Sequence, residues 1–330
     1  PVAVTWLWPS RIPLGRITLL AGRPGEGKSF LTTYMAARVS TGSPWADGTE
    51  CPRGSVIIIS AEDDPGDTIR PRADAHHADV RRIHLLTMVR HRDPDGSRYE
   101  VMFSLADLDA LEAVLKAHPD CLLIIVDPIG SFLGGRIDAY RDNEVRGVLA
   151  PLALLAQKYG VAVVVVCHHR KARSDRADDL VSDSKAFSGI ARSVWHVVRD
   201  KDNRARRLFL AGKNNLAIEG DGLAFAITGD PPAIAWEKEP VRMNADAALA
   251  DVGDDIAGAT GEAMTWLRDL LANGRMRSTE VQHLARQEGI SLSTLKRAKR
   301  KAGVQAVRDG FGAMSFWWWE AAKGLKGDHI

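Results

Sequence analysis

Eight consecutive residues near the start of the chain have the types and spacing needed to bind a phosphate chain. Residues 22–29 read GRPGEGKS and fit the pattern G-x-x-x-x-G-K-[ST]. In such a loop the glycines let backbone N–H groups turn toward phosphate oxygens, Lys28 reaches the β- and γ-phosphates, and the Ser29 hydroxyl binds Mg²⁺. The candidate nucleotide-binding residues are Gly22, Arg23, Pro24, Gly25, Glu26, Gly27, Lys28, Ser29 and Phe30.

A carboxylate for the metal is expected at the end of another strand. The run CLLIIVD ends at Asp127. In open α/β sheets ligands bind beyond the carboxyl ends of the strands, so Asp127 would hold the water shell of the Mg²⁺ ion. The alternative is an aspartate that only caps the next turn.

The residue that activates the attacking water is expected to be Glu62, which follows the run VIIIS. A carboxylate at that position can polarise a water aimed at the γ-phosphate. Asp63 and Asp64 compete for this role, and the acidic run 62–67 is alternatively a solvated turn.

Two histidines follow a third apolar run. His168 and His169 come after VAVVVVC, where polar side chains would lie over the nucleotide, and His168 is expected to contact the γ-phosphate and report its loss. A zinc site would need further ligands at metal-like spacing, and none is found in the sequence. The alternative is a pair of exposed loop histidines.

These residues require a sheet that brings several strand ends together, and the sequence predicts one. Continuous Val/Ile/Leu runs are typical of strands buried on both faces, and their alternation with helical patterns predicts an α/β fold with a mostly parallel, twisted sheet flanked by helices. The predicted helices cover 28–40, 104–118 and 143–160. The predicted strands cover 17–22, 54–62, 82–86, 121–127, 161–167, 194–198 and 206–213.

Composition adds only broad limits. The chain has 330 residues, of which 45% are hydrophobic and 26% charged, and its net charge is +2. This balance is typical of a globular protein and does not by itself indicate a nucleic-acid partner. Three separated cysteines, no 20-residue apolar run and no signal-peptide pattern at the first residues favour a reducing, cytoplasmic location. The first residue is not Met, which leaves the completeness of the N-terminus open.

The motifs together resemble a known family. The stretches LAGRPGEGKSFLTTYMAARV, GSVIIISAEDD, LLIIVDPI and VVVVCHHRKAR are similar to those of RecA-fold ATPases of the RepA-like hexameric helicase group, with KaiC and DnaB-type helicases as relatives. The resemblance covers residues 5 to about 228. It implies ATP and Mg²⁺ as cofactors, Glu62 as catalytic base and His168 as γ-phosphate sensor.

The same resemblance implies a ring, usually of six subunits, in which a basic residue reaches the neighbouring ATP site. Lys213 is the first candidate for that cation, and Arg206 and Arg207 are the alternatives. Arg192 is either a second interface cation or a surface residue. No N-terminal domain of the primase-binding kind is visible, which weakens a helicase assignment.

A mobile loop that contacts single-stranded DNA inside the ring is expected at 170–186. Backbone phosphates attract cations, and this segment is charged and rich in serine. A solvated loop of mixed charge is the alternative. The candidate contacts are Arg170, Lys171, Arg173 and Lys185.

The remainder of the chain predicts a linker and a second domain. We expect a RecA-like ATPase domain over 1–228, an acidic linker over 229–258 with a short strand at 233–236, and a winged-helix-like DNA-binding domain over 259–330. The last domain is predicted from three short helices with Gly punctuation, followed by two β-like runs.

A basic helix in this domain is the candidate duplex-DNA reader. Ser291 is the expected N-cap, and Leu292 and Leu295 are expected to point inward. The run SFWWW is expected to form wing-strand core rather than a base-stacking platform. A solvated basic face is the alternative. The candidate DNA contacts are Lys296, Arg297, Lys299, Arg300 and Lys301.

Three functions are compatible with these residues to different degrees. The favoured one is an ATP-hydrolysing, ring-forming DNA motor of plasmid, phage or mobile-element replication. The alternative is a DNA-binding ATPase switch or regulator that does not unwind DNA. A small-molecule kinase is disfavoured because no arginine-bearing lid accompanies the phosphate loop.

Overall fold

The computed structural model describes residues 3–92, 97–134, 141–169, 174, 176–181, 185–218, 220–271, 274–288, 290–309 and 316–320. The chain divides into two compact units, Pro1–Ala250 and Asp251–Ile330. Each unit has its own hydrophobic core, so each is described by itself.

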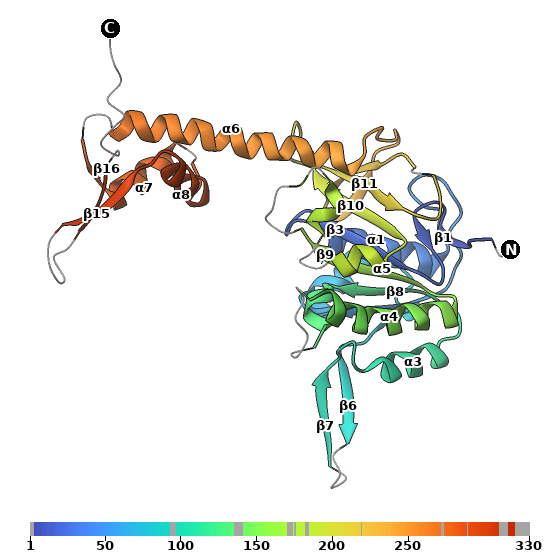
Figure 1. Cartoon of the computed structure of the whole chain (residues 1–330). Coiled ribbons are helices and arrows are strands. Elements are labelled where there is room, and N and C mark those ends of the chain that lie inside the picture. Colours follow the sequence, from blue (N-terminus) through green and yellow to red (C-terminus); the bar gives the residue numbers. More distant parts are fainter. Residues whose placement is uncertain are drawn as a thin grey trace. The chain divides into compact units, whose positions relative to one another are not determined.

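The first unit is built on a nine-stranded sheet (Figure 1). Six neighbouring strands run parallel, and the last three strands at one side continue the sheet in antiparallel fashion. In spatial order the strands are β13 (Ala233–Trp236), β12 (Leu223–Thr228), β11 (Arg206–Asn214), β10 (Ser193–Arg199), β3 (Ile17–Gly22), β9 (Ala162–His168), β8 (Cys121–Asp127), β4 (Ser55–Ser60) and β5 (Ile83–Leu85).

Alternate residues of the central strands enter two separate cores. In β3, Ile17, Leu19 and Ala21 pack on one face, and Leu20 packs on the other. Strand side chains point alternately to opposite faces, so a fully apolar strand must be covered on both sides. This is the physical reason for the layered fold.

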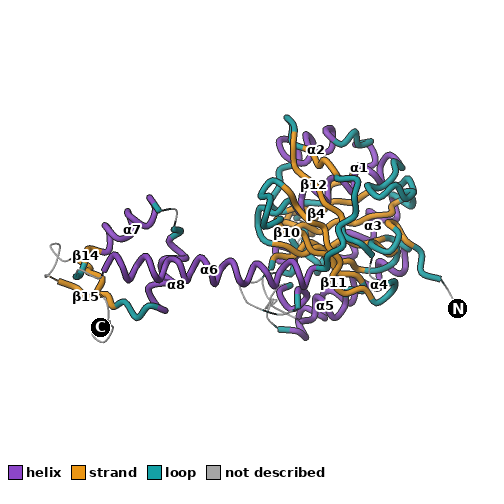
Figure 2. Tube along the Cα trace, turned by 90° about the horizontal axis from the view of Figure 1, so that it is seen from above, coloured by secondary structure: helices purple, strands orange, loops and turns teal. Residues whose placement is uncertain are grey.

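Helices cover both faces of this sheet (Figure 2). The first face is covered by α3 (Leu108–Ala117), α4 (Asp142–Tyr159) and α5 (Lys185–Ile190). The second is covered by α1 (Lys28–Thr41), the short α2 (Arg70–Ala75) beside it and the N-terminal hairpin of β1 (Trp6–Trp8) and β2 (Ile12–Pro13). A second hairpin, β6 (Met88–Arg92) with β7 (Arg98–Met102), projects from the sheet in Figure 1.

The predicted fold class is confirmed, and the predicted strands and helices of the first unit are found at their expected places. The segment 229–258 differs from the expected linker. It contains β13, at the predicted short strand, and the first half of α6 (Ala245–Leu271). Alanine-rich sequence favours a helix, and this preference outweighs the glycines and acidic residues that suggested a linker.

The second unit contains helices and a small antiparallel sheet. The sheet order is β14 (Met276–Arg277), β16 (Phe316–Glu320), β15 (Gln305–Asp309). It packs with α7 (Ser278–Gln287), α8 (Leu292–Lys301) and the C-terminal part of α6 around a core that includes Leu267, Val281 and Trp319. Across the residues that the structure describes, no helix combines the length and apolar character of a membrane span.

Candidate nucleotide-binding site

Strand pairing brings the predicted site residues to one edge of the sheet. Gly22 of β3 pairs with His168 of β9, and Ser60 of β4 pairs with Asp127 of β8. Since these strands are parallel neighbours, their carboxyl ends lie at the same edge. The loop that follows β3 therefore lies beside Asp127, His168 and the residues just after Ser60.

The loop geometry explains its glycines. Gly25 and Gly27 have φ angles of 78° and 95°, in the left-handed region that favours glycine. A Cβ on Gly22 would lie 2.6 Å from the Val197 carbonyl oxygen, so no side chain fits there. Gly27 is the N-cap of α1 and supplies no side-chain capping bond, which leaves the first amide groups of the helix available to an anion.

Lys28 is buried at the centre of this loop. Its Nζ donates to the carbonyl oxygens of Gly22 and Arg23, both at 2.9 Å. Burial lowers the pKa of Lys28, while nearby Glu26 and Asp127 act in the opposite direction. Glu26 is itself buried and accepts a hydrogen bond from the Arg23 N–H, and burial raises the pKa of its carboxyl.

Asp127 and Ser29 fit a Mg²⁺ site. Burial raises the pKa of Asp127 to about 6, a hydrogen bond from the Ser29 side chain lowers it, and the charges of Asp63 and Glu62 raise it further. A buried carboxylate among other acidic groups is stabilised by a cation. Mg²⁺ commonly takes one or two protein oxygens and completes its shell with phosphates and water. In the described part of the chain, no group of three or more His, Cys, Asp or Glu side chains is arranged to hold a metal by itself.

The three acids after β4 have different surroundings. Asp63 forms an ion pair with Arg72 at 2.8 Å, and Asp64 accepts from the N–H groups of Gly66 and Asp67. Glu62 is exposed and makes no hydrogen bond or ion pair with the residues that the structure describes. Its charge acts on Lys28, His168 and Asp127, which places it near the loop. Of the three carboxylates, Glu62 is therefore the one whose oxygens remain available to a water.

The two histidines at the end of β9 differ in burial. His168 is exposed, and burial and then the charge of Lys28 lower the pKa of its imidazole. His169 is buried and hydrogen-bonded inside the protein, so the alternative of a pair of exposed loop histidines is wrong for this residue. His168 remains the histidine that faces the loop edge.

Three arginines near the loop were not predicted to lie there. Arg199 donates to the Gly25 carbonyl oxygen at 3.2 Å, and a Cβ on Gly27 would lie 3.3 Å from the Cδ of Arg207. The Arg72 guanidinium lies 4.1 Å from the ring centre of Phe30. β10 and β11 carry the first two arginines to this edge, and only the long-range strand order could have revealed it.

Lys213 lies at the opposite edge of the sheet from the loop of its own chain. β11 runs antiparallel to β10, so Arg207 pairs with Arg199 at the loop edge, whereas Asn214 pairs with Ser193 at the far edge. Lys213 Nζ donates to the carbonyl oxygens of Ser188 at 2.7 Å and Ala191 at 3.4 Å.

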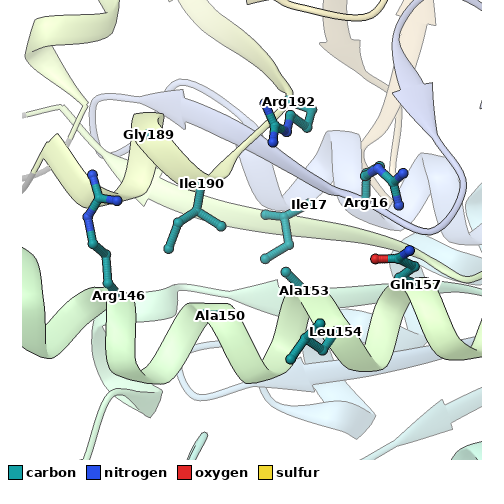
Figure 3. Close-up of a pocket in the computed structure, with 10 residues that line it drawn as sticks. All are labelled: Arg16, Ile17, Arg146, Ala150, Ala153, Leu154, Gln157, Gly189, Ile190 and Arg192. Atoms are coloured by element: carbon teal, nitrogen blue, oxygen red, sulfur yellow. The ribbon is translucent and has the colours of Figure 1, made fainter.

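Of the other three cations named for a neighbouring site, Arg207 lies at the loop of its own chain, and Arg206 and Arg192 lie elsewhere. Arg206 is held by Asp200 at 2.7 Å and Glu237 at 2.8 Å. Arg192 lines a pocket of about 520 Å³ at the edge that holds Lys213. Figure 3 shows Arg192, Arg16 and Arg146 around apolar side chains of that pocket.

The candidate DNA loop is described only in part. Arg170, Lys171 and Arg173 lie outside the described residues. Lys185 is the first residue of α5, and only its backbone is described.

The basic helix of the second unit is α8. Ser291 caps it, because its Oγ accepts from the Thr294 N–H at 3.1 Å, as predicted. Leu295 is buried, but Leu292 is 38% exposed, so the inward orientation expected for Leu292 is wrong. Lys299 lies over the Trp319 ring at 4.5 Å, and burial lowers the pKa of its ammonium group.

Four further basic residues of α8 are exposed: Lys296, Arg297, Arg300 and Lys301. The aromatic run of β16 is only partly core. Trp319 is buried, as expected for this run, whereas Phe316 and Trp317 are 46% and 53% exposed.

Comparison with known proteins is consistent with this arrangement. The chain is 25% identical over 308 residues to the DNA repair protein RadA of Mycobacterium tuberculosis, in both strain CDC 1551 / Oshkosh and strain ATCC 25618 / H37Rv. The match covers 89% of this chain and 56% of each relative, so the chain spans little more than half the length of these proteins. The AAA domain family model matches residues 1–174, which contain β3, the loop, Glu62, Asp127 and His168. With its phosphate loop at the edge of a mostly parallel α/β sheet of RecA-like type, the chain belongs to the AAA domain family.

Proposed function

We propose that the protein is an ATP-hydrolysing, ring-forming DNA motor of the replicative-helicase type, as carried by plasmids, phages or other mobile elements. The ATPase part of this proposal rests on one observation. The carboxyl ends of neighbouring parallel strands bring together Lys28, Asp127, Glu62 and His168. The name of the RadA relatives supports a DNA-associated role.

In this proposal the residues of the loop bind and orient ATP. The free amides at the start of α1 take the phosphates, and Lys28 leaves the carbonyl oxygens of Gly22 and Arg23 to reach the β- and γ-phosphates. Ser29 and Asp127 would hold Mg²⁺, which neutralises charge on the phosphate oxygens when bound. Glu62 orients and polarises the attacking water, and His168 contacts the γ-phosphate.

Lys213 is proposed to act on the ATP of a neighbouring subunit. Because it lies at the far edge of the sheet, it cannot serve the loop of its own chain. A head-to-tail ring brings two different faces of the subunit together, and we propose that the edge holding Lys213 in one subunit meets the loop edge of the next. A cation there would stabilise charge that develops on the γ-phosphate. We propose a hexamer as the assembly and Arg192 as a further cation of this face.

The second unit is proposed to be a winged-helix-like domain that binds duplex DNA through α8. Its order of helices followed by a small antiparallel sheet supports this assignment, as does the exposed basic surface of α8. Lys296, Arg297, Arg300 and Lys301 would contact phosphates, which position the domain without reading the sequence.

A strand-displacement assay on a forked DNA tests the motor proposal. We expect ATP-dependent opening of the duplex, and we expect the oligomeric mass to rise when an ATP analogue and single-stranded DNA are added. Hydrolysis of ATP without any opening of duplex would overturn the motor and leave the alternative, a DNA-binding ATPase switch. The Lys28→Ala protein is the control for both measurements.

A further inference from the structure

A buried hydrogen-bonded chain of three side chains joins the two edges of the sheet. His169 Nε2 lies 3.0 Å from His196 Nδ1, and His196 Nε2 lies 3.0 Å from Asp178 Oδ1. His196 is fully buried and His169 is 8% exposed. None of these three residues belongs to the phosphate loop, so their arrangement needs a separate explanation.

When both imidazoles are neutral, the hydrogen bonds among these three side chains can run in only one direction, from His169 to His196 to Asp178. The Asp178 carboxylate can only accept, so His196 carries its proton on Nε2 and its Nδ1 is an acceptor. His169 must then donate from Nε2, which leaves its Nδ1 as an acceptor. That buried atom has no hydrogen-bond partner among the described residues. Burial lowers the pKa of His169 to about 2, in agreement with a neutral ring.

One end of the chain is fixed to the phosphate loop. The backbone N–H of His169 donates to the Gly22 carbonyl oxygen at 3.1 Å. The same oxygen accepts from Lys28 Nζ. A change in the hydrogen bonds of Lys28 therefore acts on an atom that also holds His169.

The other end of the chain is fixed to the backbone of Lys213. Both carboxylate oxygens of Asp178 accept from the Lys213 N–H, at 3.1 and 3.4 Å. The residue before it is glycine for a steric reason, because a Cβ on Gly212 would lie 2.5 Å from Asp178 Oδ1 and 2.7 Å from His196 Nε2. The backbone at the end of β11 is thus packed directly against the His196–Asp178 pair.

We propose that His169, His196 and Asp178 are positioning residues that connect the phosphate loop to the backbone of Lys213 and hold this lysine in the position from which it acts on the neighbouring subunit. The inference rests on the proposed function, since it concerns the same lysine. It predicts that a subunit changed at one of these three residues is impaired in supplying Lys213 to its neighbour, whereas its own ATP site remains intact.

The test uses Asp178→Asn in the full chain, which keeps the shape of the side chain but cannot accept from His196 and Lys213 as the carboxylate does. We expect kcat to fall about 10- to 100-fold, the cost of a small displacement of a reacting group, while ATP affinity stays at the wild-type value. Asp179→Asn is the matched control, since this exposed neighbour in the same turn bonds Ser174 instead. Its kcat should match wild type.

Mixed assemblies separate a positioning role from a purely structural one. Asp178→Asn subunits have an intact ATP site, and Lys28→Ala subunits have an intact Lys213. Random mixing gives the required pairing at about one interface in four, so the mixture should be more active than either impaired protein alone. Gly212→Ala should behave like Asp178→Asn, because its added methyl group meets the same pair.

The outcomes distinguish this inference from the proposed function. If Lys213→Ala and Lys28→Ala subunits restore each other but Asp178→Asn and Lys28→Ala subunits do not, the positioning chain is wrong and the trans-acting lysine stands. If Lys213→Ala and Lys28→Ala do not restore each other, the trans-acting lysine itself is wrong. Weaker ATP binding by Asp178→Asn alone would also overturn the positioning chain. Wild-type ATP affinity in that variant shows that it has folded.

Discussion

Ser60 of β4 and Asp127 of β8 are paired across the sheet, and the N–H of Ala61 donates to the Asp127 carbonyl oxygen at 3.3 Å. This pairing fixes where the chain leaves β4, so that Glu62 emerges beside the buried carboxylate of Asp127. The distance between these two carboxylates is thereby set by main-chain hydrogen bonds. Both carboxylates then lie at the same end of the sheet, although 65 residues of sequence separate them.

Lys28→Ala should weaken ATP binding. The ammonium makes hydrogen bonds to two carbonyl oxygens in the structure and would exchange them for phosphate oxygens. Loss of a hydrogen bond to a charged group costs about 1.5–3 kcal/mol, or about 10- to 100-fold in affinity. Titration with a fluorescent ATP analogue measures this. Lys116→Ala is a control at an exposed site, and an equal effect of both changes would argue against the assigned role of Lys28.

Binding of Mg²⁺–ATP should become weaker as the pH falls through about 6. The Asp127 carboxyl has a pKa of about 6 in the folded chain, with Lys28, Glu62 and Asp63 as its charged neighbours. Only the ionised form binds a metal. When affinity is measured between pH 5 and 8, the weakening of binding near pH 6 should be absent in Asp127→Asn. The same weakening in the variant would show that another group titrates.

The same shift predicts the sign of a stability change in the nucleotide-free protein. The pKa of Asp127 is higher in the folded chain than its ordinary value, so the folded state binds more protons between the two values. This group therefore makes the protein more stable as the pH falls from about 7 to about 4. Thermal unfolding of wild type and Asp127→Asn over this range gives the measurement. The stability of the variant should depend less on pH than that of the wild-type protein.

Arg199 and Arg207 should act on the ATP site of their own chain. Arg199 bonds the Gly25 carbonyl oxygen, and Arg207 lies against Gly27. Alanine at either position should lower kcat/KM by about tenfold, the value of one lost charged hydrogen bond. Mixing with Lys28→Ala subunits should not restore activity. Arg206→Ala is the matched control for Arg207→Ala, because Asp200 and Glu237 hold the Arg206 guanidinium away from the loop. Rescue of Arg207→Ala by mixing would move this arginine to the neighbouring site.

Two basic residues of α8 should behave differently in DNA binding. Arg300 is exposed, so Arg300→Ala should weaken binding to all sequences and reduce the slope of log K against log salt by about one. Lys299 lies over the Trp319 ring. Its replacement by alanine should lower the free energy of unfolding of the second unit by about 0.5–1 kcal/mol. Salt titrations with duplex DNA, combined with thermal unfolding, separate the two effects. A larger salt effect for Lys299 than for Arg300 would contradict this assignment.

The central strands were predictable because their signal is local. A run such as CLLIIVD is apolar at every interior position, and β8 covers the same residues, Cys121–Asp127. The rule that ligands bind beyond the carboxyl ends of parallel strands then predicts that Asp127 and Glu62 lie together. The glycines of the phosphate loop were equally readable, since left-handed backbone restricts the residue type.

What the sequence did not reveal depends on contacts between distant segments. Arg199 and Arg207 reach the loop because β10 lies next to β3 and β11 turns back beside it. The partnership of His169 with His196 and Asp178 also needs three segments that no short pattern connects. The helix over the first half of α6, inside the expected linker 229–258, was missed for a different reason, namely that acidic and small residues are compatible with both a linker and a helix.

The most direct test of the central claim is ATP turnover by Glu62→Gln compared with wild type. The account predicts that the wild-type protein hydrolyses ATP with Mg²⁺. It also predicts that Glu62→Gln binds ATP with unchanged affinity but turns it over about 100-fold more slowly, as expected for loss of a general base. Equal turnover by the two proteins would contradict the assigned site, as would a wild-type protein that binds no ATP.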